Sequence, residues 1–345
     1  MLIDEQPLKL TIIFVKIVYY LHLYDNAYNR YNKVVFEIAD DKGWCDGNNR
    51  HFEVEGDLIM KDFKDKVMFI TGTAHGFGQV IAQAGAQRGM KLALVDIDET
   101  ALAATAKTIA DTGATVITVT ADVTKEDEVN AAIDETMKVF GQIDLLINDA
   151  GIALAGRMWE LPTRDWEWIL HINVMAQVYT MKKIIPIMMA QKTHGTILNV
   201  SSIAGLIDTP GMPAYHASKF ASVGLTEATA YDLQRAEADI EMHVMCPGFV
   251  QTDLYHTEDH RPAQYRDDQD PYYQSEAFAK GQQVAKYVIT NGMPIDTIAD
   301  TVFKALEDNE FYILTHPEFN PLIQDRVNRI VNHKAPDVHV MDGLM

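Results

Sequence analysis

The sequence predicts an α/β fold of the doubly wound type, with a seven-stranded parallel sheet and helices on both faces. Short, almost continuously apolar runs alternate with segments in which apolar residues recur at helical spacing. Strands that are apolar throughout are typical of a parallel sheet buried between two layers of helices. The predicted strands are residues 66–71, 92–95, 115–120, 143–147, 195–200, 240–245 and 311–315.

The helices between the first four strands follow from apolar spacing and from capping residues. Apolar residues at helical spacing occupy 77–84, and Gly89 ends that helix. Asp98 is the expected N-cap of the second helix. Thr124 with Asp127 predicts a capping box at the start of the third helix.

The later helices are longer, and no repeat or low-complexity tract interrupts the order. One helical segment covers about residues 165–191, with Pro186 near its end, and another covers about residues 213–238. Residues 60–345 are therefore predicted to form a single domain, with a substrate lid at about residues 254–288. Ligands of this fold bind at the carboxyl ends of the strands.

Length and composition exclude several classes of protein. Hydrophobic residues make up 48% of the 345 residues and charged residues 23%, so the chain is globular and neither disordered nor fibrous. The formal charge of −20 repels phosphate backbones and anionic lipid, so no nucleic acid and no membrane partner is predicted. Cys45 and Cys246 cannot build a disulfide framework or a cysteine zinc site, which favours a reducing cytoplasm.

The first predicted strand ends in a glycine-rich turn, TGTAHGFG, at residues 71–78. Glycines at Gly72, Gly76 and Gly78 would let a pyrophosphate reach the backbone N–H groups at the start of the next helix. Glycine also simply punctuates loops, so spacing alone gives the binding interpretation about even odds. The order of strand, turn and helix favours binding.

Asp96 ends the second predicted strand, where a carboxylate can accept hydrogen bonds from the ribose hydroxyls of adenosine. It would repel a 2′-phosphate, and residues 73–75 supply no Arg or Lys to bind one, although His75 could carry part of a positive charge. NAD is therefore the predicted cofactor and NADP the less favoured one. The alternative interpretation makes Asp96 a solvated residue at a strand end.

Tyr215 and Lys219 are four residues apart and share one face of a predicted helix. The ordinary pKa of tyrosine, about 10, is too high for acid–base work near neutrality, and a nearby ammonium is a physical means of lowering it. A solvated surface pair is the alternative, and the neighbouring motifs argue against it.

Taken together, these motifs resemble the short-chain dehydrogenase/reductase family, in its compact single-domain branch with a Rossmann fold, over about residues 60–315. The matching motifs are TGTAHGFG, the pair Asp122-Val123, NDAG at 148–151, NVSSIAG, YHASK at 215–219 and PGFVQT at 247–252. The resemblance implies the catalytic residues Asn173, Ser202, Tyr215 and Lys219. It implies cofactor contacts from Thr71, Gly72, His75, Gly76, Phe77, Gly78, Asp96, Asp122, Val123, Asn148, Ala150, Gly151, Tyr215, Lys219, Pro247, Gly248, Val250 and Thr252.

The resemblance also implies a reaction. Tyr215 would exchange a proton with the substrate oxygen while hydride moves between the substrate carbon and the nicotinamide, and Ser202 would hydrogen-bond that oxygen. Lys219 would lower the tyrosine pKa and hold the nicotinamide ribose, and Asn173 would position a water. Asp149 departs from the family's second asparagine and cannot donate an amide hydrogen bond, so we expect locally weaker contacts there.

The predicted substrate is an alcohol or ketone that is apolar or ring-bearing, bound between 152–159, 203–213 and the lid. The aromatic residues of the lid either line that pocket or pack the lid against the body, with equal weight. The lid's charged residues, Arg261, Arg266, Asp267, Asp268 and Asp270, are predicted to form a solvated surface. No metal site is predicted, because histidines 171, 216, 243, 256 and 260 show no ligand spacing.

Two other functions stay open. One is an NADPH-dependent reductase of carrier-protein thioesters in the same family, which Asp96 and the acidic composition disfavour. The other is a non-catalytic NAD-sensing protein on the same fold, which the complete catalytic set disfavours. A homodimer or homotetramer through the helices at 165–191 and 213–238 is expected from the resemblance.

Residues 1–59 form an N-terminal extension whose place in the native protein is open. Its most apolar run, 10–24, contains Lys16 and His22 and is shorter than a membrane span, and no secretory signal is evident. Met60 opens MKDFKDKVMFITG, which looks like the natural start of a nucleotide-binding domain. One hypothesis is that 1–59 is an upstream misreading, and native peptides from 1–59 would contradict it.

Overall fold

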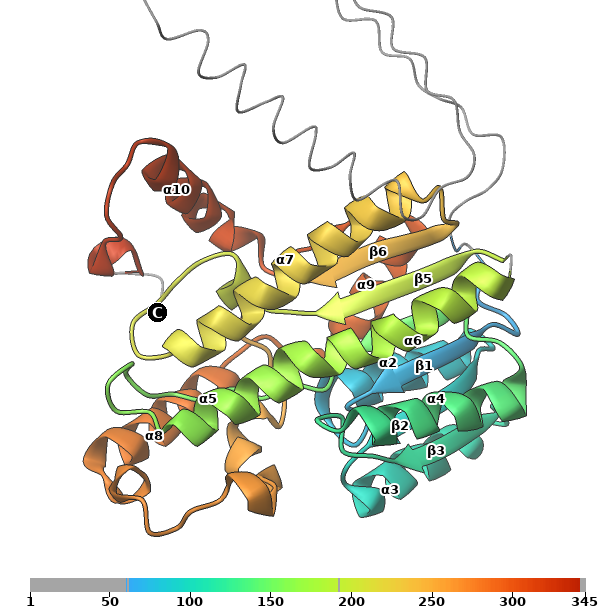
Figure 1. The fold of residues 1–345 in the computed structure, drawn as a ribbon, viewed down its shortest axis with the longest axis horizontal. Helices are drawn as coiled ribbons and strands as arrows, with labels where there is room; N and C mark the ends of the chain where they lie inside the picture. Colours follow the sequence, from blue (N-terminus) through green and yellow to red (C-terminus); the bar gives the residue numbers. More distant parts are fainter. Residues whose placement is uncertain (1–59, 61, 192, 342–345) are drawn as a thin grey trace, which may run out of the picture. The chain divides into compact units, whose positions relative to one another are not determined.

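The computed structural model describes Met60, residues 62–191 and residues 193–341. The extension 1–59, and the hypothesis about it, lie outside the described residues. Seven parallel strands form one sheet, as predicted, and their order is β3-β2-β1-β4-β5-β6-β7 (Figure 1). They are β1 (Val67–Thr71), β2 (Lys91–Asp96), β3 (Val116–Thr120), β4 (Leu145–Asn148), β5 (Gly195–Val200), β6 (Ile240–Met245) and β7 (Tyr312–Ile313).

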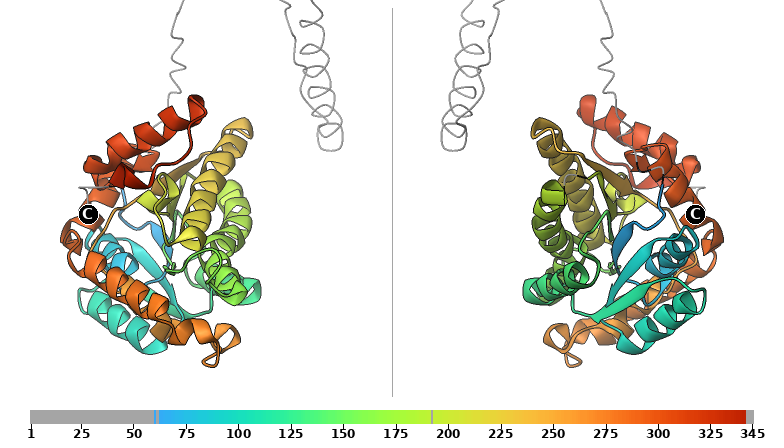
Figure 2. Two further views of the ribbon diagram at one scale, coloured as in Figure 1. Left: turned by 90° about the vertical axis from the view of Figure 1, so that its left-hand side faces the viewer. Right: turned by 90° about the vertical axis from the view of Figure 1, so that its right-hand side faces the viewer.

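Helices cover both faces of this sheet, also as predicted (Figure 2). On one face, α2 (Gly76–Gln87), α3 (Glu99–Ala110) and α9 (Ile298–Glu307) pack on the sheet. On the other face lie α4 (Glu126–Phe140), α6 (Ala176–Gln191) and α7 (Pro213–Arg235). The five inner strands are almost wholly buried because both faces are covered, which explains their apolar sequences, whereas the edge strand β3 is partly exposed. None of the helices in the described ranges is both long and apolar enough to cross a bilayer.

The helix starts show one confirmed cap and one wrong one. Asp98 caps α3, since its side chain accepts a hydrogen bond from the N–H of Ala101 at 3.0 Å. The predicted capping box at Thr124 is wrong, because α4 begins after Lys125 without a side-chain cap. The Thr124 hydroxyl donates instead to the Asp122 carboxylate at 2.7 Å, so it shapes the turn after β3.

The long helical segment before β5 is not uniform. It consists of α5 (Thr163–Leu170), a π-helical turn (His171–Met175) and α6. The lid follows β6 and contains three short 3₁₀ segments, at Leu254–His260, Ala263–Tyr265 and Pro271–Gln274, and then α8 (Glu276–Thr290). After β7 comes α10 (Asn320–Val331).

Candidate active site

A cavity of about 230 Å³ lies at the carboxyl ends of the central strands, beneath the lid. β1 and β4 are neighbours here, and the helices that follow them cover opposite faces of the sheet. This is where doubly wound sheets bind ligands. Most predicted cofactor residues line the cavity, namely Gly72, His75, Gly76, Phe77, Asp96, Asp122, Val123, Ala150, Gly151, Tyr215, Lys219, Pro247, Gly248, Val250 and Thr252.

The glycine turn between β1 and α2 has a shape that side chains would destroy. Gly72 and Gly76 have positive φ angles of 74° and 59°, which disfavour other residues. A Cβ on Gly72 would lie 2.8 Å from the backbone nitrogen of Ala150, and one on Gly78 would lie 2.1 Å from the carbonyl oxygen of Gly72. The turn therefore forms a backbone cradle at the N-terminus of α2, which fits a dinucleotide pyrophosphate.

Asp96 stands at the mouth of this cradle. Its carboxylate accepts hydrogen bonds from the N–H of Ala74 at 2.8 Å and from the N–H of Asp98 at 3.0 Å. These bonds fix the carboxylate beside the glycine turn and leave it partly exposed toward the cavity. The position suits an acceptor for ribose hydroxyls.

Asn148 and Gly78 do not line the cavity. The Asn148 side chain is buried, donates to Asn199 Oδ1 at 2.8 Å and accepts from the Thr180 hydroxyl at 2.7 Å. Asn148 therefore joins β4 to β5 and α6 instead of contacting a ligand with its side chain. A cofactor contact from Asn148 therefore stays a prediction and would have to use its backbone.

Thr71 also braces the strand ends instead of the cavity wall. Its hydroxyl oxygen accepts from the N–H groups of Asp149 and Ala150, both at 3.2 Å, which holds the backbone path of the NDAG motif. The Asp149 carboxylate accepts from the N–H of Gly78 at 2.7 Å. This contact needs only an acceptor, which Asp and Asn both supply, so the substitution by Asp does not remove it.

Asp149 and Lys219 form a pair of ionisable groups close to their titration points. Burial raises the pKa of Asp149 to about 7, against the opposing effects of the Gly78 N–H and the nearby Lys219 ammonium. Burial lowers the pKa of Lys219 to about 8, and the Asp149 carboxylate opposes this change. The charge of this part of the cavity therefore varies around neutral pH.

Ser202, Tyr215 and Lys219 line the same cavity as the cradle. Burial raises the pKa of Tyr215, and a hydrogen bond with Ser202 opposes that rise. The expected lowering by Lys219 is not found. Its Nζ lies 5.8 Å from the centre of the tyrosine ring and donates instead to the carbonyl oxygen of Val200 at 3.1 Å.

Asn173 lies in the π-helical turn, which apolar spacing does not reveal. Its amide donates to the Ile152 carbonyl oxygen and to the Ser218 hydroxyl, both at 2.9 Å, and its Oδ1 accepts from the Ile152 N–H at 2.9 Å. The side chain is fully buried and ties the loop after β4 to α7. Ser201, beside Ser202 in the NVSSIAG motif, donates to the Lys219 carbonyl oxygen at 2.9 Å.

The rest of the cavity wall is mainly apolar. Only Ile152 of the predicted wall 152–159 lines it, and none of 203–213 does. Ile203 and Ile207 pack instead against Phe319 and Leu322 around α10. The apolar lining residues that the sequence analysis did not single out are Trp168, Ile172, Leu254, Pro262 and Ile289.

Four aromatic residues of the lid, Tyr265, Tyr272, Tyr273 and Phe278, pack it against the body, and no aromatic residue of the lid lines this cavity. The Tyr272 hydroxyl donates to the Ala155 carbonyl oxygen at 2.6 Å, and the Tyr265 hydroxyl is 2.9 Å from His171 Nδ1. Of the two interpretations left open, packing is therefore the one observed. The missed signal was the phenolic hydroxyl, which favours a partner at the boundary of a core.

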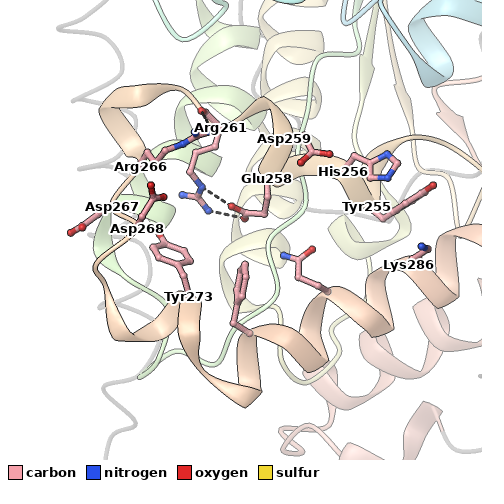
Figure 3. A pocket seen from close by; sticks show the side chains of 12 residues that line it. Tyr255, His256, Glu258, Asp259, Arg261, Arg266, Asp267, Asp268, Tyr273 and Lys286 are labelled. Atoms are coloured by element: carbon pink, nitrogen blue, oxygen red, sulfur yellow. Dashed lines mark hydrogen bonds and ion pairs between the residues drawn. The ribbon is translucent and has the colours of Figure 1, made fainter.

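The prediction of a solvated charged lid is wrong for Arg261. Its side chain is 3% exposed and pairs with Asp165, 1% exposed, at 2.6 Å. It also bonds both oxygens of Glu258 at 2.8 Å, as Figure 3 shows, and lies over the Trp168 ring at 4.3 Å. Arg266 and Asp268 are exposed, as predicted.

Arg261 forms part of a second cavity, of about 490 Å³, within the lid itself. In Figure 3 its walls come from the 3₁₀ segment after β6, the following loop and α8. The lining residues are Tyr255, His256, Glu258, Asp259, Arg261, Arg266, Asp267, Asp268, Tyr273, Phe278, Gln282 and Lys286. The chemistry-bearing residues Ser202 and Tyr215 belong to the first cavity only.

Comparisons with known proteins agree with this geometry. Residues 66–263 match the family described as short chain dehydrogenase. The chain is 77% identical over 286 residues to a CLA biosynthesis dehydrogenase/reductase of Lactiplantibacillus plantarum, covering 83% of this chain and all of that protein. It is 29% identical over 280 residues to a C alpha-dehydrogenase of Sphingobium, covering 80% and 89%.

A solved structure gives the same result. The short chain dehydrogenase/reductase of Burkholderia phymatum in complex with NAD is 36% identical, with a TM-score of 0.78, over 81% of this chain and 98% of that one. Fold, ordered motifs and cavity all agree with these matches. The chain belongs to the short-chain dehydrogenase/reductase family of oxidoreductases.

Proposed function

We propose that this chain is an NAD(H)-dependent oxidoreductase that interconverts a secondary alcohol and a ketone. One observation carries the proposal: Ser202, Tyr215 and Lys219 face the same cavity as the glycine cradle. Acid–base groups and a dinucleotide site within one cavity are what hydride exchange at a carbon–oxygen bond requires.

The residues have separate parts. Tyr215 exchanges a proton with the substrate oxygen, and Ser202, which lines the same cavity as the tyrosine, positions that oxygen. Lys219 provides a positive charge and hydrogen-bond donors at the cavity wall. Asn173, whose side-chain atoms bond the Ile152 backbone, acts by holding the proton-transfer end of the site and a water there. A bound nicotinamide dinucleotide supplies the carbon that gives or takes the hydride.

The glycine turn, Asp122, Val123 and the segment 247–252 are proposed to hold the dinucleotide. Asp96 favours NAD over NADP, because its fixed carboxylate accepts hydrogen bonds from ribose hydroxyls and repels a 2′-phosphate. The NAD complex of the Burkholderia phymatum relative supports this preference. His75 beside Asp98 offers a weaker counter-charge than an arginine would.

The proposed substrate is an apolar alcohol or ketone. The cavity is also lined by Ile152, Trp168, Ile172, Leu254 and Ile289, which suit hydrocarbon. The name of the Lactiplantibacillus plantarum relative, CLA biosynthesis dehydrogenase/reductase, supports a dehydrogenase or reductase step on a related compound. We propose that residues 60–345 work as one catalytic domain in a homodimer or homotetramer.

The test is the initial rate of NAD+ reduction, beside NADP+, over a panel of apolar secondary alcohols. We expect turnover with NAD+ and a fall of about 1,000-fold or more in Tyr215→Phe, because the proton-transfer group is lost. The Kd for NADH should change by no more than about twofold, since binding uses the cradle. Tyr231→Phe is the control, because Tyr231 lies on the same helix and is 71% exposed.

Each of the other outcomes would contradict one part of the proposal or favour an alternative function. Full turnover in Tyr215→Phe would refute the mechanism, and turnover only with NADP+ would refute the interpretation of Asp96. Turnover confined to carrier-protein thioesters with NADPH would favour the reductase alternative. NADH binding without turnover on any substrate, unchanged in Tyr215→Phe, would favour the sensor.

A further inference from the structure

Two histidines and one carboxylate from distant segments meet at the mouth of the main cavity. His75 precedes α2 in the glycine turn, while Asp253 precedes the first 3₁₀ segment of the lid and His260 is its last residue. One ligand atom from each of the three residues lies within 4.8 Å of the other two. Spacing in the sequence does not reveal this cluster, because only the fold brings residue 75 close to residues 253 and 260.

The distances within this cluster do not suit ordinary hydrogen bonds. His260 Nε2 lies 3.6 Å from Asp253 Oδ2, and the His75 and His260 ring centres are 5.8 Å apart. Within the described residues, neither imidazole ring has a hydrogen-bond partner. Ligand atoms around a tetrahedral zinc ion are about 3.4 Å apart, given bonds of about 2.1 Å. Shifts of about 1 Å in these partly exposed side chains would therefore complete a coordination shell.

The carboxylates around the cluster are already oriented. Asp253 Oδ1 is bonded to His256 Nδ1, which leaves Oδ2 directed at His260. His256 itself stands on the lid segment in Figure 3. A carboxylate ligand held by a second imidazole is a common arrangement around protein metals. Asp98 uses Oδ1 to cap α3, and its Oδ2 lies 3.8 Å from His75 Nε2, so it adds negative charge beside the cluster.

We propose that His75, Asp253 and His260 bind a divalent transition-metal ion of the zinc class. Two imidazoles with one carboxylate favour zinc over magnesium, which prefers oxygen ligands and keeps its waters. Because His75 belongs to the glycine turn and the other two ligands to the lid, the ion ties the lid to the turn at the cavity mouth. Metal binding is tested without nicotinamide cofactor, so its outcome is independent of the proposed function.

The test is calorimetric titration of the full chain with Zn²⁺ after removal of metals by a chelator. We expect one ion per chain, with affinity at least tenfold weaker in His260→Gln and in Asp253→Asn. His333→Asn is the matched control, since His333 is exposed in the turn after α10 and far in sequence from the cluster. Excess Mg²⁺ should not displace the zinc. No binding of Zn²⁺, or binding equal in all three variants, would overturn the site.

A separate measurement tests whether the bound ion links the lid to the glycine turn. Zn²⁺ should slow amide hydrogen exchange in residues 253–260 of the parent protein and leave it unchanged in His260→Gln. X-ray absorption at the zinc edge should show imidazole nitrogen and carboxylate oxygen ligands. Zinc bound with no effect on exchange in 253–260 would overturn the tie, and a spectrum without imidazole would overturn the assignment of the ligands.

Discussion

The glycine turn and the lid line the same cavity, but different chemistry holds them. The turn is built from backbone, with glycines at contacts where a Cβ would lie 2.1–2.8 Å from main-chain atoms. The lid is held by long side chains, chiefly Arg261 bonded to Asp165, which is 96 residues earlier in the chain. One region depends on the absence of side chains and the other on their charge.

This difference sets how each region should fail. A substitution in the turn should cause a steric clash and weaken ligand binding first, because the turn rests on the sheet through short backbone contacts. A substitution in the lid should remove an ion pair and lower the stability first, because the main anchor of the lid is a pair of buried charges. Three substitutions test the contrast.

The largest expected effect on stability is in the lid. Arg261→Met leaves Asp165 buried without its cationic partner, which costs about 3–5 kcal/mol of unfolding free energy. Urea unfolding, with hydrogen exchange in residues 254–290 to detect local opening, measures the loss. Arg266→Met is the control, because that side chain is exposed and should change stability by less than about 0.5 kcal/mol. Equal stability of the two variants would show that the lid does not depend on this pair.

A substitution in the glycine turn should mainly weaken the binding of the cofactor. In Gly78→Ala the new Cβ would lie 2.1 Å from the Gly72 carbonyl oxygen, so the turn must shift. We expect the Kd for NADH to rise about 100-fold, corresponding to about 2.7 kcal/mol. Gly224→Ala is the matched control, since that helical glycine has no atom within 4 Å of the added Cβ. It should leave binding unchanged and raise stability by up to about 1 kcal/mol.

The smallest expected effect is on the pH dependence of stability and concerns Asp149, whose carboxylate accepts a hydrogen bond from Gly78 of the turn. Its pKa of about 7 exceeds the unfolded value of 3.8, so the folded state binds the proton more tightly. The contribution of Asp149 to stability therefore falls as pH rises from about 4 to 7. Asp149→Asn removes this dependence while keeping the acceptor for Gly78.

We expect the stability of Asp149→Asn relative to the parent to rise by about 1–2 kcal/mol between pH 5 and pH 8. Urea unfolding at both pH values measures it. Asp268→Asn, at an exposed carboxylate, makes the same change of charge and should show no such difference. If the stability difference between the parent protein and Asp149→Asn is the same at both pH values, the raised pKa of Asp149 is contradicted.

Prediction from sequence succeeded where the determining contacts are local. Asp98 caps the helix that starts beside it, and short apolar runs mark all seven strands, of which the five inner ones are buried on both faces. It failed where a polar side chain had a choice of partners. Thr124 bonds Asp122 instead of capping α4, and Asn148 bonds Asn199 and Thr180 instead of facing the cavity.

Sequence by itself determined the doubly wound sheet and most of the cavity wall, because strand burial and the glycine turn depend on residues that are close together in the chain. Only the tertiary structure decided the environment of the lid. Whether Arg261 is solvated or buried, and whether His75 meets Asp253 and His260, depends on segments 96 to 185 residues apart. Side-chain charge alone does not encode such distances, since an ionic group can be satisfied equally by water or by a partner that folding brings to it.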